Sequence, residues 1–435
     1  MGIKRTFIKN TSFNIGSYIY LVIASIISIP ILVNSLGIRT FGFYTLITSI
    51  LPILSVFDFG MSQAAIRNLS LPGANEDDKT KTWQTSFYFF LITGILLFLT
   101  VIGIFQLYIY RLPTISNIIG NSSLPLMFIV ATTVLLNHLN AHFMTISQAR
   151  QRYDIFSLYS FIAGTANTLL AAIISLIKPD LSLIFFVRLV GIIITLLIMW
   201  IYSRKHFPAV NFPKFHPEQF KKMISFGLRS FAGRVFSIIE AYGLNFILAS
   251  FIALQAVTYF SIPQSLIIKA AGGISMLTLS LFPLSTSLLT KENFFKLKKL
   301  IAWLQVGIIG LGVSAIMVIL IVGKPLLLLW LRDAELVNNI YPILQILSIQ
   351  LFLVSLTPMP TAVLESMNFP AIPSFFAFLT VMIEFSLLFF LLPRFGVNGA
   401  AMALSASVMI TVPAFLLVFF NRFRKFEQKL YAPKT

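Results

Sequence analysis

The chain has no cysteine among its 435 residues, and only 11% of its residues are charged. The missing cysteine excludes disulfide bonds, thiol chemistry and thiolate metal sites. A soluble domain of average composition has about 25% charged residues, whereas this chain is 57% hydrophobic and has a mean hydropathy of +0.91. Because it has too little polar surface to dissolve as a globule, the composition predicts a membrane protein.

Long apolar stretches account for most of the sequence. A membrane-spanning helix needs about 20 apolar residues, and stretches of that length are too long for the short alternating strands of an outer-membrane barrel. The first stretch lacks the small-residue cleavage site of a signal peptide, so we expect it to remain as the first helix. We therefore predict an all-α polytopic membrane protein with about twelve transmembrane helices. The stretches are 12–33, 41–63, 84–108, 124–146, 156–177, 181–203, 223–249, 254–282, 298–322, 339–363, 371–393 and 396–421.

The basic residues are distributed unevenly over the gaps between these stretches. Of the 32 lysines and arginines, 22 lie in alternate gaps or in the two tails, 6 lie in the intervening gaps, and 4 lie inside the stretches. Cytoplasmic loops carry an excess of lysine and arginine, so this pattern predicts that both termini are cytoplasmic. The net charge of +18 is spread over several short loops and tails. It therefore indicates attraction to anionic membrane lipids and argues against a nucleic-acid surface.

The longest strongly polar connection, residues 204–222, has six apolar stretches on each side. The segments that begin at Ile31 and Ile247, 216 residues apart, align weakly. Because six is an even number, such a repeat would be parallel, with its axis along the membrane normal. We expect two six-helix lobes around a central cavity. The predicted parts are an N-terminal lobe (1–203), a cytoplasmic linker (204–222), a C-terminal lobe (223–421) and a basic cytoplasmic tail (422–435).

Two segments carry a family resemblance. The first contains Gly37, the aromatic turn 41–44, the Asp-x-Gly of residues 58–60 and Arg67, in that order, and the second begins at Val322 with a glycine and leads into the tenth stretch. Both resemble polysaccharide flippases of the multidrug/oligosaccharidyl-lipid/polysaccharide exporter superfamily, and most of all the O-antigen and capsule repeat-unit flippases. The peptidoglycan-precursor flippases look similar but usually carry two further helices.

The resemblance implies a carrier in the bacterial cytoplasmic (inner) membrane. It would move polyprenyl-diphosphate-linked oligosaccharide repeat units between the leaflets by alternating access of two lobes. Glycan polymerase and chain-length proteins are possible partners, and no cofactor is expected. The sequence lacks a phosphate loop, and its outer connections are too short for the catalytic outer loop of a polymerase or ligase, so we expect no enzyme activity.

Four basic residues lie inside the apolar stretches, where a charge costs about 2.5–3.5 kcal/mol on insertion scales. They are Arg188, Arg229, Arg234 and Lys269. Because such cations pair with phosphate oxygens, they are candidates for binding the diphosphate. Arg229 and Arg234 lie about 140° apart on a straight helix, so either Gly227 and Gly233 allow a bend or one arginine serves elsewhere. Lys269 and Arg234 are the stronger candidates, and Arg188 is the weakest.

The acidic residues inside the stretches are Asp58, Glu240 and Glu384. Glu384 has no base within a turn, so it is either protonated or bonded to another helix. A structural hydrogen bond is the stronger interpretation, and a proton or sodium coupling site is the other. Glu240 is a second candidate for coupling. Asp58 either contacts substrate or fixes Arg67 or the following loop.

His138 and His142 lie four residues apart on one helix face. This spacing can bind a metal ion, but no third ligand accompanies the pair, so we expect no metal. Hydrogen bonding to sugar or proton handling in a polar cavity wall fits these residues better.

The alternative function is a cation-coupled multidrug exporter of the same superfamily. A pocket for cationic drugs is expected to be acidic and aromatic. Here four bases and three clear acids lie inside the apolar stretches, which favours an anionic substrate.

Overall fold

The computed structural model describes residues 3–431, except 72–74, 113–114, 116–117, 119–122, 207–213, 279–284, 286–287 and 290–291. Its description also excludes the side chains of residues 3–14, 229–230, 232–234, 237 and 276–278. The elements in the described part of the chain are all helices. The predicted all-α polytopic fold is therefore confirmed, and the chain is a multi-pass membrane protein.

Contacts divide the chain into two units, residues 1–255 and 256–435. Unit 1 contains α1 (Ile3–Ser55), η1 (Val56–Asp58), α2 (Met61–Ser70), α3 (Glu76–Leu107), η2 (Ile109–Arg111), α5 (Ser123–Ala149), α6 (Tyr153–Thr165), η4 (Ala166–Leu170), α7 (Ala171–Ile177), α8 (Leu181–His206), α9 (Pro217–Ile238), η5 (Ile239–Gly243) and α10 (Leu244–Phe251). Unit 2 contains α11 (Leu254–Thr278) from its third residue onward, α13 (Phe294–Leu331), α14 (Ala334–Ser355), α15 (Pro358–Ser366) and α16 (Ala371–Tyr431).

Two of the longest helices are each a pair of membrane spans joined at a glycine. In α1 the break is Gly37, with φ 77°, and in α16 it is Gly396, with φ 54°. L-residues with a side chain rarely adopt these angles, so glycine is the residue that lets the chain turn back there. The breaks fall between the predicted stretches 12–33 and 41–63, and at the start of 396–421, respectively.

Eight helical segments in the described residues are long and apolar enough to span a membrane, and two of these are the kinked pairs. The eight do not include α9 or α11, which carry Arg229, Arg234 and Lys269. Such bases are costly in hydrocarbon and are characteristic of functional helices.

The predicted stretch 41–63 is not one continuous helix. The helix α1 ends at Ser55, and Phe59 and Gly60 both have positive φ (47° and 72°) before α2 begins. Asp58 therefore lies in the single 3-10 turn η1, at the end of the candidate span and between α1 and α2. Sequence periodicity missed this break because the residues on both sides of it are apolar.

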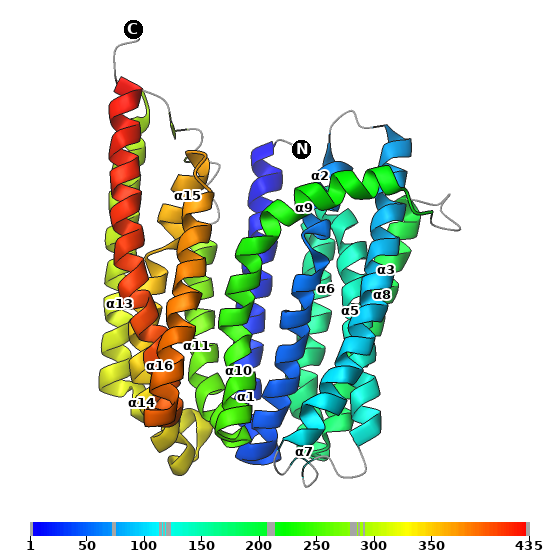
Figure 1. The fold of residues 1–435 in the computed structure, drawn as a ribbon, viewed down its shortest axis with the longest axis vertical. Helices are drawn as coiled ribbons and strands as arrows, with labels where there is room; N and C mark the ends of the chain where they lie inside the picture. Colours follow the sequence, from blue (N-terminus) through cyan, green and yellow to red (C-terminus); the bar gives the residue numbers. More distant parts are fainter. Residues whose placement is uncertain are drawn as a thin grey trace. The chain divides into compact units, whose positions relative to one another are not determined.

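The segment α9–η5–α10 packs against the first helices of the chain within unit 1. Asn245 Nδ2 donates to Ser49 Oγ at 2.8 Å, and Tyr108 Oη donates to Phe246 O at 2.8 Å. Hydrogen bonds of this kind join helices where no hydrophobic force does so. The helix α9 crosses one end of unit 1, and the chain turns toward α10 (Figure 1). A bend in this region is one of the two alternatives that the sequence leaves open for Arg229 and Arg234. The division into lobes at residues 204–222 stays a prediction.

A pair of glycines allows α9 to touch the turn that follows α1. A Cβ added to Gly60 would overlap the backbone of Gly227, and one added to Gly227 would lie 2.5 Å from the Phe59 carbonyl oxygen. Neither position can hold a side chain without moving the backbone. Met61 and Met223 are both fully buried in the adjoining cluster, which extends this contact.

We predict that Gly60→Ala destabilises the purified protein. The positive φ alone costs an alanine about 1–2 kcal/mol, and the overlap with Gly227 adds to this. The measurement is the thermal unfolding midpoint in detergent. Gly103→Ala is the control, because Gly103 is helical and has nothing within 4 Å of an added Cβ. Equal midpoints for Gly60→Ala and the wild type would contradict the contact.

Candidate functional site

The turn between α1 and α2 presents a carboxylate. Asp58 Oδ1 accepts a hydrogen bond from the Gly60 N–H at 2.9 Å, which fixes the left-handed turn. An aspartate that bonds the backbone two residues later is a common way to close such turns. Arg67 lies instead over the Phe226 ring, 4.8 Å from its centroid. Asp58 therefore fixes the following turn, which was one of the two structural roles expected for it.

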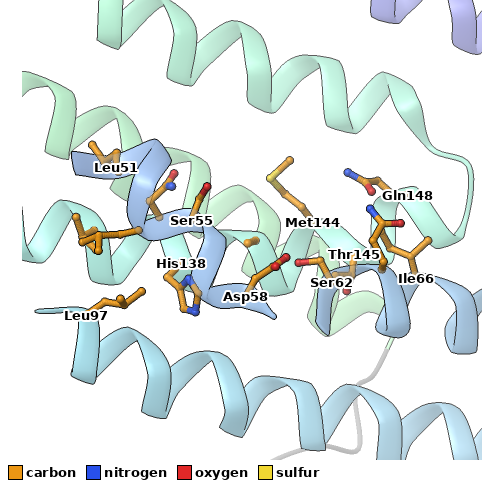
Figure 2. Close-up of a pocket in the computed structure, with 15 residues that line it drawn as sticks. Leu51, Ser55, Asp58, Ser62, Ile66, Leu97, His138, Met144, Thr145 and Gln148 are labelled. Atoms are coloured by element: carbon orange, nitrogen blue, oxygen red, sulfur yellow. The ribbon is translucent and has the colours of Figure 1, made fainter. Parts of the chain in front are cut away.

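A cavity of about 230 Å³ opens beside this turn, entirely within unit 1. Figure 2 shows Asp58, His138, Ser62 and Gln148 around it. The polar groups that line it are a carboxylate, an imidazole, amides and hydroxyls. They come from α1 and its continuation η1, from α2 and from α5. The lining residues are Leu51, Leu54, Ser55, Asp58, Ser62, Gln63, Ile66, Leu97, Val134, Asn137, His138, Ala141, Met144, Thr145 and Gln148.

His138 connects the cavity to α3. Its Nε2 lies 2.8 Å from Thr93 Oγ1, and the Thr93 hydroxyl donates to the Phe89 carbonyl oxygen at 2.6 Å. The single hydroxyl proton of Thr93 is used in the bond to Phe89, so Thr93 Oγ1 accepts from His138 and Nε2 is the donor. In the neutral ring Nδ1 is then an acceptor. The imidazole can accept a hydrogen bond from a sugar hydroxyl or take up a proton.

His142, one helical turn away, is part of the packed interior. Its side chain is fully buried and does not line the cavity. The ring contacts Trp83, Phe87 and Phe143 at centroid distances of 5.2, 5.5 and 4.9 Å, and Nδ1 lies 2.8 Å from Ser86 Oγ. The structure therefore separates the histidine pair: His138 lies at the cavity, and His142 lies among aromatic rings.

Arg188 is buried between helices of unit 1, away from the cavity beside Asp58. Its Nε donates to Asn167 Oδ1 at 2.8 Å, and the guanidinium lies over the rings of Tyr44 and Phe185. Asn167 belongs to η4, a single π-helical turn. These contacts give the buried cation an amide and two aromatic faces as partners, while its buried Nη1 has no hydrogen-bond partner among the described residues.

The other predicted residues are not among the described residues that line the cavity. The side chains of Arg229 and Arg234 fall outside the described residues. Glu240 lies in the π-helical turn η5 of unit 1 and is partly buried. In unit 2, Lys269 is partly buried and its Nζ donates to Ser265 O at 3.3 Å, while Glu384 is almost fully buried in α16. The cavity beside Asp58 thus includes two of the predicted residues, Asp58 and His138.

The sequence analysis missed most of the cavity's amides and hydroxyls. On α5, positions 137, 138, 141, 144, 145 and 148 line it, and this spacing is one face of a helix. A search for polar residues at helical spacing around His138 would have found Asn137, Thr145 and Gln148. Asn140 is on another face, where its Nδ2 bonds Thr195 Oγ1 at 3.1 Å.

This arrangement can hydrogen-bond a polar ligand or hold a cation or proton at the carboxylate. The combination of one acid, one imidazole and several neutral donors and acceptors suits sugar hydroxyls. Among the residues that the structure describes, no three His, Cys, Asp or Glu side chains are grouped to hold a metal ion.

Comparisons with known proteins place these observations in context. The sequence pattern of the family described as "Polysaccharide biosynthesis protein" matches residues 7–289. A Shigella flexneri protein named "Putative O-antigen transporter" is 23% identical over 94% of this chain and 96% of its own length. Among solved structures, a multidrug resistance MATE family transporter of the MOP superfamily matches with a TM-score of 0.79 at 13% identity, covering 97% of this chain and 96% of that one. The lipid II flippase MurJ matches with a TM-score of 0.70 at 15% identity, covering 95% and 90%.

The natural absence of cysteine allows a direct test of the cavity. We predict that Ser62→Cys, at the cavity wall, reacts with a charged, water-soluble methanethiosulfonate in inverted membrane vesicles, because thiol reactivity requires water access. Ser147→Cys is the control, because Ser147 is fully buried on α5. Mass spectrometry measures the labelled fraction. Equal labelling of the two variants, or labelling of Ser62→Cys only in intact cells, would contradict a cavity that opens to the side where the basic residues predict the cytoplasm.

Proposed function

Since the chain belongs to the polysaccharide biosynthesis protein family, we propose that it carries polyprenyl-diphosphate-linked oligosaccharide repeat units across the bacterial cytoplasmic membrane. It acts as a carrier and not as an enzyme. Both termini lie in the cytoplasm, as the distribution of basic residues indicates. Glycan polymerase and chain-length proteins would then act on the repeat units that it delivers.

The observation that carries this proposal is the mixed polar lining of the cavity in unit 1. Asp58, Asn137, His138 and Gln148 place a carboxylate, an imidazole and two amides around one space. Sugars are bound by such combinations, because each hydroxyl both donates and accepts. Apolar neighbours such as Leu51 and Leu97 limit competition from water. The cavity is small compared with an oligosaccharide, so it would hold one part of the sugar chain.

The charged end of the substrate needs cations. Lys269 on α11 and Arg234 and Arg229 on α9 lie inside the apolar stretches 254–282 and 223–249, where a charge costs about 2.5–3.5 kcal/mol on insertion scales. A diphosphate leaving water would repay that cost by pairing with them. Alternating access would expose these residues first to one leaflet and then to the other. In this scheme Arg188 supports the fold of unit 1, through Asn167 and two rings.

The transport step also needs a source of free energy. Asp58, Glu240 and Glu384 are the candidates for binding a proton or a sodium ion, because each is a carboxylate at or within a membrane helix. Of these, Asp58 lines the cavity, where an ion could reach it. This same carboxylate supports the alternative function, a cation-coupled multidrug exporter.

We predict that Lys269→Ala abolishes or strongly reduces surface glycan while the protein still inserts into the membrane. A hydrogen bond to a charged group is worth about 1.5–3 kcal/mol, so loss of one cation should weaken diphosphate binding by roughly 10- to 100-fold. The measurements are the surface polysaccharide and the lipid-linked repeat units extracted from a complemented deletion strain. Those units should accumulate in the variant.

The matched control is Lys269→Arg, which retains the positive charge and should keep most of the activity. Arg234→Ala should behave like Lys269→Ala. Normal surface glycan in both alanine variants would contradict a diphosphate site on α9 and α11. A deletion strain with normal glycan but increased drug susceptibility would favour the exporter instead.

A further inference from the structure

A second cavity lies in unit 2, at the cytoplasmic end predicted for α16. Its volume is about 480 Å³, and it lies between the last turns of α16 and the connection from α15 to α16. Figure 1 shows α15 and the C-terminal end of α16 near each other in this unit. The lining residues are Met367, Phe369, Arg422, Lys425, Phe426, Lys429 and Leu430.

One wall of this cavity is the connection from α15 to α16, and a C-terminal cap of α15 fixes its backbone. Asn368 has φ 67°, its N–H donates to Glu365 O at 3.0 Å, and the Phe369 N–H donates to Leu364 O at 2.8 Å. These two bonds with a left-handed residue between them form a Schellman cap. The cap holds Met367 and Phe369 on either side of Asn368, and both line the cavity. The apolar part of the site is therefore fixed by backbone geometry.

The other wall is one face of α16. Arg422, Lys425 and Lys429 recur at helical spacing, so the three cations lie on the same side of the helix. Arg422 lies over the Phe369 ring, 5.5 Å from its centroid. Glu427, the acidic residue of this segment, bonds Lys298 Nζ at 3.0 Å. No carboxylate is among the described residues that line the cavity.

Helix structure alone does not account for these three cations. Like charges three or four residues apart repel each other on a helix. The helix dipole favours a cation only in the last turn of a helix. That turn contains Lys429, whereas Arg422 lies nine residues before the end of α16. Three cations without a carboxylate among the described residues of the cavity wall suit an anion from outside the chain.

The position of the cavity identifies the kind of anion. Arg422 is the first charged residue after the last apolar stretch, so the cations lie at the level of the lipid headgroups. Their apolar neighbours include the buried Met367 and the partly buried Phe369, Phe426 and Leu430. We propose that this cavity binds an anionic phospholipid, with its phosphate on Arg422, Lys425 and Lys429 and its glycerol and acyl ends on Met367 and Phe369. The site is separate from the proposed transport cavity and does not depend on the proposed function.

The test is a lipid titration of the purified full-length protein in a neutral detergent. Dioleoylphosphatidylglycerol should raise the thermal unfolding midpoint in a saturable way, because a ligand that binds the folded state stabilises it. Dioleoylphosphatidylcholine and inorganic phosphate should not. Equal stabilisation by phosphatidylcholine would overturn the requirement for an anionic lipid, and equal stabilisation by phosphate would overturn the lipid as the ligand.

Variants assign the effect to this cavity. Each basic residue near the membrane surface contributes about a 5-fold gain in affinity, so Arg422→Gln, Lys425→Gln and Lys429→Gln together should weaken the apparent affinity for phosphatidylglycerol by roughly 100-fold. The matched control is Lys296→Gln, Lys299→Gln and Arg424→Gln, which removes three charges outside the cavity and should leave the affinity within a few-fold of wild type. Equal losses in both triple variants would show a general surface effect and overturn the site.

A single variant keeps the test usable if the triple variant does not fold. Lys425→Gln should lower the affinity about 5-fold, and Lys425→Arg should preserve it, because the charge remains. Unchanged affinity in Lys425→Gln would overturn the proposal.

Discussion

Hydrocarbon offers no partner to a peptide N–H or C=O, and this constraint determines most of the structure. It is the reason that the described membrane segments are helical and that their breaks occur at special positions. Gly37 and Gly396 supply the angles that other residues avoid. At the turn after α1, Asp58 bonds the Gly60 N–H that the helix can no longer satisfy. The carboxylate at the candidate site is therefore also the group that closes the turn, and it lines the cavity.

Polar side chains inside the protein serve two distinct purposes, which their neighbours reveal. His142 and Asn140 join helices within the core of unit 1, whereas His138 and Asn137, which also bond neighbouring helices, line a space that a ligand can enter. Both pairs come from the same stretch of α5. A carrier needs both kinds: the first kind keeps a unit rigid while it moves, and the second kind gives a substrate groups to bind. Glycine contacts such as Gly60 with Gly227 add rigidity without adding polarity.

The sequence predicted the all-helical membrane fold, its family and the presence of buried charges, because composition and apolar length report these directly. It also named Asp58, His138 and His142 as candidate site residues, of which Asp58 and His138 line the cavity. It did not predict that α1 ends at Ser55, since apolar residues continue on both sides. Nor did it separate His138 from His142. Residues four apart share a helix face, and only the neighbouring helices decide whether that face meets a cavity or aromatic rings.

The central claim is that the chain moves a lipid-linked oligosaccharide from one leaflet to the other. The most direct measurement uses the purified protein in phospholipid vesicles that contain a polyprenyl-diphosphate-linked oligosaccharide. A glycosidase that cannot enter the vesicles reports the fraction of sugar in the outer leaflet. The account predicts that nearly all of the substrate becomes accessible in vesicles with the protein, and that about half does so with the Lys269→Ala variant or in empty vesicles. Accessibility that is the same with and without the wild-type protein, in vesicles where its insertion is verified, would contradict the account.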